Sequence, residues 1–334
     1  VGSIPYIALQ LKAVSGSVGL VMEHYGSAFD PSSFVFGDIS LPVAAVLAVF
    51  AILFGTRHTD ATEHQNGLIL AVALESVIKL SAFLAVGFAC TFFVFGSPGE
   101  LIEKISQSPA ALDAFHYETS IGTWIVHTTL SAAAIIMLPR QFHVTVVESR
   151  SEKELRTASW LFPLYLILIN IFVFPIALIG VMTLGNTVSG DLYVLALPLS
   201  AGAHWLALIA FLGGLSAATA MVIVACVALA IMISNHLVLP LIIRRLAVRH
   251  PTEQRDLTMI ILNTRRLTII GILALAFVYY RMASNNIHLA SIGLISFAAI
   301  AQFMPSFIGG LFWRNANGRG AMLGLSAGFL IWAY

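Results

Sequence analysis

Apolar residues along this chain gather into nine runs, which are separated by polar segments of differing charge. Eight of the runs have the length of a bilayer-crossing helix, which needs about 20 predominantly apolar residues, and the ninth stops with the chain. Their nearly uniform apolarity predicts membrane-spanning helices. The runs cover 4–22, 39–56, 68–96, 121–138, 159–184, 205–239, 264–283, 286–313 and 320–334.

Composition supports a multi-pass membrane protein. Hydrophobic residues make up 59% of the chain and charged residues 10%, whereas a soluble domain carries about 25% charged residues. The net charge of +1, with no basic stripe outside the short loops, argues against nucleic acid as a partner. Cys90 and Cys226 lie inside apolar runs and are expected to be small core residues. No CxxC, HExxH or glycine-rich phosphate loop occurs, so we expect no enzyme activity from this segment.

The polar segments predict the orientation of the helices. Lys104 is the only Lys or Arg in the segments 23–38, 97–120, 185–204 and 284–285, which hold eight acidic residues. Thirteen of the 17 Lys and Arg residues fall instead in 57–67, 139–158, 240–266 and 314–319. Because basic residues are retained on the cytoplasmic side, the second set of segments and the N-terminus of the chain are predicted to be cytoplasmic.

Three charged residues, Lys12, Glu75 and Lys79, lie within runs rather than at their ends. Glu75 and Lys79 are four positions apart, so they share a helical face and can pair. A paired couple costs much less to bury than either charge alone. No acidic residue stands three or four positions from Lys12 in the sequence, and Lys12 is expected either to meet Glu75 across the bundle or to extend toward the cytoplasm. The three charges indicate an internal ion pair that fixes helix packing, or part of a solute or ion path.

Several runs are interrupted or ended by proline. Pro163 and Pro175 lie in one run, Pro305 in another, and Pro139 follows the run 121–138. Broken helices expose backbone groups that cannot face lipid, so they tend to line cavities or ion sites. Kinks that serve packing alone are equally common.

The run 205–239 carries small and hydroxyl-bearing residues near its beginning, with the sequence GGLSAATA at 213–220. A spanning helix gains little from such residues unless something approaches it closely. The partner could be another helix, a bound cation or a bound solute.

Five short segments resemble one family of carriers. PYIALQL at 5–11, FGTRHTDATE at 54–63 and SFIGGLFW at 306–313 are similar to segments of the sodium:solute symporter family, which includes bacterial proline and pantothenate carriers and animal sodium–glucose transporters. LPRQFHV at 138–144 and SIGLISF at 291–297 resemble more narrowly the variant that is fused to a sensor histidine kinase in bacteria.

The resemblance implies an all-α membrane protein with the inverted five-plus-five helix (LeuT-like) transporter core. On that pattern, 1–334 is one transmembrane symporter-like domain, a fragment with eight full spans and a truncated ninth, which lacks the first two core helices. It also implies the cytoplasmic (inner) membrane of a bacterium as the location.

In the family, the helix that corresponds to 205–239 supplies a sodium site together with the first core helix. The family pattern is Ala-x-x-Ser followed by Ser or Thr, and oxygen ligands suit a hard cation. One register places Gly213, Ser216 and Ala217 on this pattern, and another places Ser216, Thr219 and Ala220 on it. Each register lacks one hydroxyl, but Ser216 and Thr219 are three positions apart and can face one point in either.

The resemblance places the sixth core helix, which contributes to the solute pocket in the family, at 121–138. Trp124, His127 and Thr128 are candidate pocket residues there by position and polarity. A lone buried histidine such as His127 is more often a hydrogen-bonded structural residue than a proton relay. Lys12, Glu75 and Lys79 are assigned to the same substrate pathway.

Two functions follow as hypotheses. The first is a sodium-coupled carrier of a small organic solute, an amino or carboxylic acid, that works by alternating access. The second is the same fold acting as the sensory domain of a two-component histidine kinase, with the kinase in the same chain and a response regulator as partner. Motif similarity favours the second, and a stand-alone sodium-coupled transporter is the alternative. A purely structural membrane anchor would not need the charges or the small-residue segment.

Overall fold

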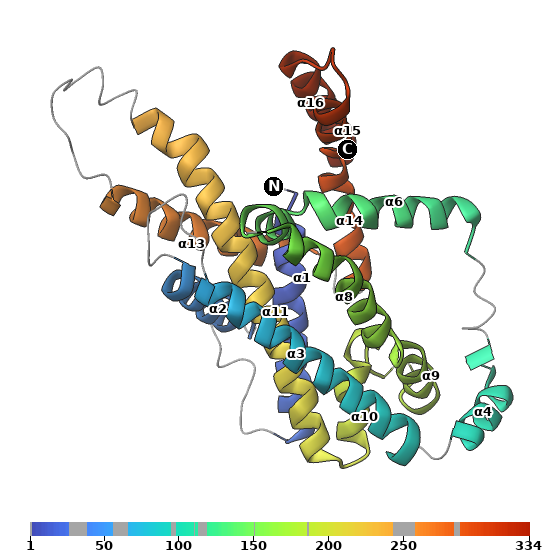
Figure 1. Cartoon of the computed structure of the whole chain (residues 1–334). Coiled ribbons are helices and arrows are strands. Elements are labelled where there is room, and N and C mark those ends of the chain that lie inside the picture. The colour runs from blue at the N-terminus through green and yellow to red at the C-terminus, as the bar shows by residue number, and fades with distance from the viewer. Residues whose placement is uncertain are drawn as a thin grey trace.

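The computed structural model describes residues 2–26, 39–55, 66–94, 98–109, 111–112, 119–149, 151–185, 187–242, 258–283 and 288–334. This part of the chain is helical and contains no strand (Figure 1). The prediction of an all-α membrane protein is therefore confirmed at the level of its helices. The first half comprises α1 (Ile4–His24), α2 (Ser40–Gly55), α3 (Asn66–Ala89), η3 (Cys90–Val94), α4 (Pro98–Gln107), α6 (Ile121–Met137), α7 (Pro139–Phe142) and η4 (His143–Val147).

The second half of the chain continues in the same way. It comprises α8 (Glu152–Asn170), α9 (Val173–Thr183), η5 (Gly190–Leu192), α10 (Tyr193–Ser200), α11 (His204–Ile233), η6 (Ser234–Val238), α13 (Thr258–Met282), α14 (Leu289–Ala301), α15 (Met304–Phe312) and α16 (Gly318–Ala333). Three of the short elements, η3, η4 and η6, are π-helical, and η5 is a 3-10 turn.

Six stretches within the described residues are long and apolar enough to cross a membrane. A seventh results if α6 and the segment after it count as one broken span. The chain is thus a multi-pass membrane protein. Over the predicted runs 39–56 and 320–334, α2 and α16 have 16 residues each, below the usual bilayer-spanning length. The six stretches are Ile4–His24, Ile69–Phe93, Glu152–Thr183, His204–Ile242, Thr258–Met282 and Leu289–Phe312.

Helix α11 is the central element of the structure and packs against α1, α2, α3, α7, α10 and α13. Helices in lipid associate through close packing, which small residues allow, and the second half of α11 supplies them at Ala225, Ala228 and Ala230, all buried. Cys226 is also fully buried there, and both it and Cys90 are free thiols. The predicted role of the two cysteines as core residues is confirmed.

A second cluster joins α3, α9 and α10 near the other end of α11. It contains Val86, Ile179 and Leu197. A Cβ at Gly180 would lie 2.2 Å from the Tyr193 ring, so this glycine lets α10 pack directly on α9. The Tyr193 hydroxyl donates to the Gly185 carbonyl at 2.9 Å. These contacts hold α10 beside α3 and α11.

The span that begins with α6 is broken by 47° at Leu138. Leu138 has an extended backbone conformation, as expected for a residue before proline, where the helical conformation is disfavoured. Pro139 then occupies the first turn of α7, where its missing N–H costs nothing. In Figure 1, α6 extends sideways from the bundle. Helix α7 packs against α11.

Candidate functional site

A cavity of about 460 Å3 lies among α1, α3, α8, α9, α10 and α11. Most of its wall is apolar, which is usual for small-molecule sites with a few polar groups that orient the ligand. The polar side chains on the wall are Ser17, Lys79, Asn170 and Asp191. Sites of this volume accommodate small organic solutes.

The small-residue segment of α11 contributes to the cavity in part. Gly213, Gly214 and Ala217 line it, together with Leu215. A Cβ at Gly213 would lie 2.6 Å from the Ala82 Cβ atom, so α11 and α3 pack closely at Gly213. Nothing lies within 4 Å of a Cβ at Gly214. Gly213 thus allows helix packing, and Gly214 leaves space open.

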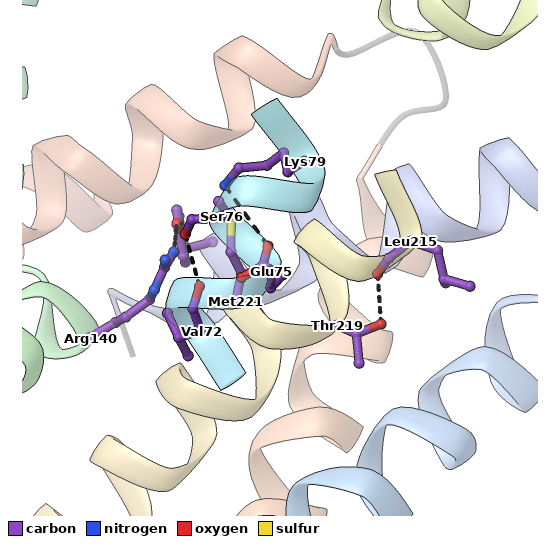
Figure 2. Close-up of polar contacts among 9 residues, drawn as sticks. Val72, Glu75, Ser76, Lys79, Arg140, Leu215, Thr219 and Met221 are labelled. Atoms are coloured by element: carbon purple, nitrogen blue, oxygen red, sulfur yellow. Dashed lines mark hydrogen bonds and ion pairs between the residues drawn. The ribbon is translucent and has the colours of Figure 1, made fainter. Parts of the chain in front are cut away.

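The two hydroxyls expected to bind sodium lie elsewhere on α11. Ser216, Thr219 and Ala220 are half-buried and do not belong to the cavity wall in the described part of the chain. The Thr219 hydroxyl donates to the Leu215 carbonyl of its own helix at 2.7 Å, as Figure 2 shows. Its oxygen keeps lone pairs that could still bind a cation.

Glu75 and Lys79 form the ion pair expected from their spacing. The Lys79 Nζ atom lies 3.9 Å from Glu75 Oε1 and 5.9 Å from the centre of the Tyr165 ring. Glu75 exposes only 6% of its surface, and neither of its carboxylate oxygens has a hydrogen-bond partner among the described residues. Lys79 is therefore part of the cavity wall and at the same time pairs with the buried carboxylate of Glu75, one helical turn away.

Arg140 belongs to the same group of charges, although the sequence placed it in a cytoplasmic loop. It reaches from α7 toward the part of α3 that carries Glu75 and Lys79 (Figure 2). Its Nη1 atom donates to the Tyr6 hydroxyl of α1 at 3.4 Å. That hydroxyl in turn donates to Met221 Sδ of α11 at 3.6 Å. The proline break after α6 was the sequence signal that could have located Arg140.

The residues predicted on α6 lie apart from the cavity. Trp124, His127 and Thr128 are on an exposed surface of α6, where Trp124 exposes 68% of its area. The Thr128 hydroxyl donates to the Trp124 carbonyl at 2.8 Å. Among the described residues, Trp124 and Thr128 border a shallow groove that is lined by α6. Lys12 is half-buried on α1 and is not on the cavity wall.

Asp191 and Asn170 on the cavity wall were not selected from the sequence. Asp191, which counted only as a charge in an outer loop, accepts a hydrogen bond from the Leu289 N–H at the start of α14 at 2.9 Å. Asn170 ends α8 and donates from Nδ2 to the Leu166 carbonyl at 2.7 Å. Asn170 immediately precedes the short break between α8 and α9, so the broken helix borders the cavity, as broken helices in membranes often do.

Comparisons of the chain with protein-family models, with curated proteins and with solved structures found no match. The helices themselves define the class of protein, a multi-pass helical membrane protein.

Proposed function

We propose that the chain is a sodium:solute symporter-type module that binds a small organic solute, an amino or carboxylic acid, and translocates it together with a cation. The cavity of about 460 Å3 is the observation that carries this proposal. It is lined by six helices, and its wall is apolar apart from a few polar groups. A structural anchor has no need of such a space.

The polar groups of the wall favour a carboxylate-bearing solute. Lys79 supplies a positive charge at the wall, and its present partner, Glu75, lies at the long distance of 3.9 Å. A solute carboxylate could pair with Lys79 at a shorter, charge-assisted distance. Asp191 and Asn170 would face the remainder of the solute.

Sodium coupling is part of the proposal because of the hydroxyls on α11 and the motif resemblance. Ser216 and Thr219 offer two oxygens three positions apart, and oxygen is the ligand that hard cations prefer. The sensory role beside a histidine kinase rests on the similarity of 138–144 and 291–297 to the fused variant. A kinase in the same chain and a response regulator are the partners it implies.

Uptake by the full-length protein in proteoliposomes tests the proposal. We expect radiolabelled acetate, proline or another amino acid to accumulate with an inward sodium gradient and not with an equal potassium gradient. Thr219→Val is expected to weaken the sodium dependence, because it replaces the hydroxyl by a methyl group of similar size. Thr183→Val on α9 is the matched control, since its hydroxyl makes the same bond within its helix, to the Ile179 carbonyl at 2.7 Å.

Uptake that is unchanged by removing sodium and by Ser216→Ala would refute the cation coupling. The sensory role has a separate readout. Autophosphorylation of the full-length protein should change when a transported solute is added, and a constant rate would favour the stand-alone carrier.

A further inference from the structure

Four residues from four helices lie next to the cavity and make up what we call the closing layer: Tyr6, Glu75, Arg140 and Met221. Tyr6 on α1 contacts both Arg140 on α7 and Met221 on α11. Glu75 on α3 pairs with Lys79 of the cavity wall, and Arg140 reaches toward this part of α3 (Figure 2). A hydrogen-bonded and charged group of this kind inside a spanning bundle usually has a function, because polar groups are costly there.

The closing layer lies at the same end of the cavity on all three of the long helices. On α1, Tyr6 lies about two turns from Ala13, the first cavity residue of that helix. On α3, Glu75 lies one turn before Lys79.

Helix α11 places its member of the closing layer at the same end of the cavity, although the predicted topology makes α11 antiparallel to α1 and α3. On α11, Met221 lies one turn after Ala217, the last residue of that helix on the cavity wall. By the charge pattern of the loops this end of the cavity is cytoplasmic.

The contacts within the layer are weak and can separate at low cost. The Arg140–Tyr6 bond measures 3.4 Å, beyond the distance of a strong hydrogen bond. The Tyr6–Met221 bond, at 3.6 Å, has a thioether sulfur as its acceptor, and such sulfurs accept only weakly. The Arg140 Nε atom and both Glu75 oxygens have no hydrogen-bond partner in the described residues. Elements that move are drawn from the weakly held parts of a protein.

We propose that this layer is the gate that closes the solute cavity on the side where the loops are basic, with Arg140 as its positioning residue. After the break at Leu138 and Pro139, α7 packs against α11, and Arg140 thereby reaches Tyr6 and extends toward Glu75 (Figure 2). Separation of Arg140 from α1 and α3 opens the cavity to that side. The assignment of a solute to the cavity rests on the proposed function, whereas the closure itself does not.

The gate also links the cavity to the bend of α6. Lys79 lies on the cavity wall and pairs with Glu75, and Arg140 reaches toward the same part of α3 (Figure 2). A ligand carboxylate that pairs with Lys79 leaves the Glu75 carboxylate to Arg140 and draws α7 toward α3. A ligand in the cavity thereby changes how strongly α7, the cytoplasmic part of the broken span, is attracted to α3.

Accessibility of a cysteine in the cavity tests the gate without any ligand. Ser17→Cys, on the cavity wall, is introduced into the full-length protein in membrane vesicles. A membrane-impermeant maleimide is then applied from each face, and peptide mass spectrometry reads each cysteine separately. Cys90 and Cys226, both fully buried, report on folding because they react only if the bundle opens.

We expect Arg140→Ala to raise the labelling rate of Ser17→Cys from the cytoplasmic face about tenfold, the change expected for one lost hydrogen bond to a charged group. Labelling from the opposite face stays the same. Tyr6→Phe removes the accepting hydroxyl alone and is expected to produce a smaller increase in the same direction. Arg156→Ala, which removes an exposed charge on α8, is the control and leaves the rate unchanged.

Equal cytoplasmic labelling in the parent, Arg140→Ala and Tyr6→Phe proteins would overturn the gate, as would an equal rise from both faces. If Cys226 becomes labelled in the Arg140→Ala protein, that variant has failed to fold, and the Tyr6→Phe result alone tests the gate. Solute uptake plays no part in this readout. A protein without uptake but with the labelling change would therefore refute the proposed function alone, and the reverse result would refute the gate alone.

Discussion

Glu75 illustrates at the scale of one residue how a charge is kept inside the spanning bundle. Glu75 is 6% exposed, its carboxylate pairs with Lys79, and Arg140 reaches toward it from α7 (Figure 2). Glu75→Gln leaves two positive charges in a buried site without their common counter-charge. Because an uncompensated buried charge is strongly destabilising, we expect a loss of about 3 kcal/mol in the free energy of unfolding, measured by denaturation in detergent.

A double variant separates the effect of the lost charge from any effect on packing. Lys79→Met added to Glu75→Gln removes one of the stranded charges and is expected to recover a large part of the loss. Glu23→Gln, at the exposed end of α1, is the matched control and should be nearly neutral. Equal stabilities of the Glu75→Gln protein and the double variant would contradict the ion-pair interpretation.

The residue scale also shows which parts of the site the sequence could predict. The Glu75–Lys79 pair depends on a spacing of four within one helix, so the sequence predicts it. Arg140 and Asp191 join the site through contacts with helices distant in sequence, to Tyr6 and to Leu289. No local pattern encodes such contacts, and both residues were counted only as loop charges.

At the scale of the element, the close packing of α3 against α11 depends on a glycine, Gly213. A Cβ at Gly213 would lie 2.6 Å from the Ala82 Cβ atom, which real Cβ contacts essentially never allow. Gly213→Ala must therefore push the helices apart, and we expect a loss of about 1–3 kcal/mol, seen as a lower Tm. Ala82→Gly in the same protein removes the opposing methyl group and is expected to restore most of the Tm.

The adjacent glycine provides the control for this prediction. Gly214→Ala meets nothing within 4 Å, and alanine has the higher helix propensity, so its Tm should stay the same or rise. A similar loss at both glycines would mean that backbone flexibility, and not close packing, is the reason for them.

The positions of the long helices followed from hydrophobicity, whereas shorter elements did not. The segments 97–120 and 185–204 were predicted as outer loops, yet they hold α4 and α10. Eight residues are too few for a span, so the apolar sequence of α10 gave no signal. Its burial against α9 depends on the Gly180–Tyr193 contact, which arises only in the folded bundle.

At the scale of the whole molecule, the arrangement of the helices in space was not predictable from their apolarity. Spans that face lipid and spans that face protein are equally apolar, and the choice of neighbours depends on small residues and shape. Residues 222–228 of α11 are all buried, whereas residues 121–129 of α6 are all exposed. The placement of Trp124, His127 and Thr128 outside the cavity follows from this arrangement of α6.

Orientation in the membrane is the remaining property of the whole molecule, and the loop charges predict it. Thirteen of 17 Lys and Arg residues fall on one side of the alternating topology, and the cost of moving them across a bilayer sets the direction of insertion. We expect Ala158→Cys at the exposed start of α8 to react with an impermeant maleimide only after cells are permeabilised. Ser106→Cys on exposed α4 is expected to react in intact cells.

The two native cysteines make this measurement direct, because both are fully buried and remain unlabelled in the folded protein. The opposite labelling pattern would place the basic segments outside. Tyr6, Glu75, Arg140 and Met221 would then face the exterior, and the gate they form would control entry of the solute rather than its release into the cytoplasm. The direction in which the closing layer acts therefore depends on the same charges that orient the chain.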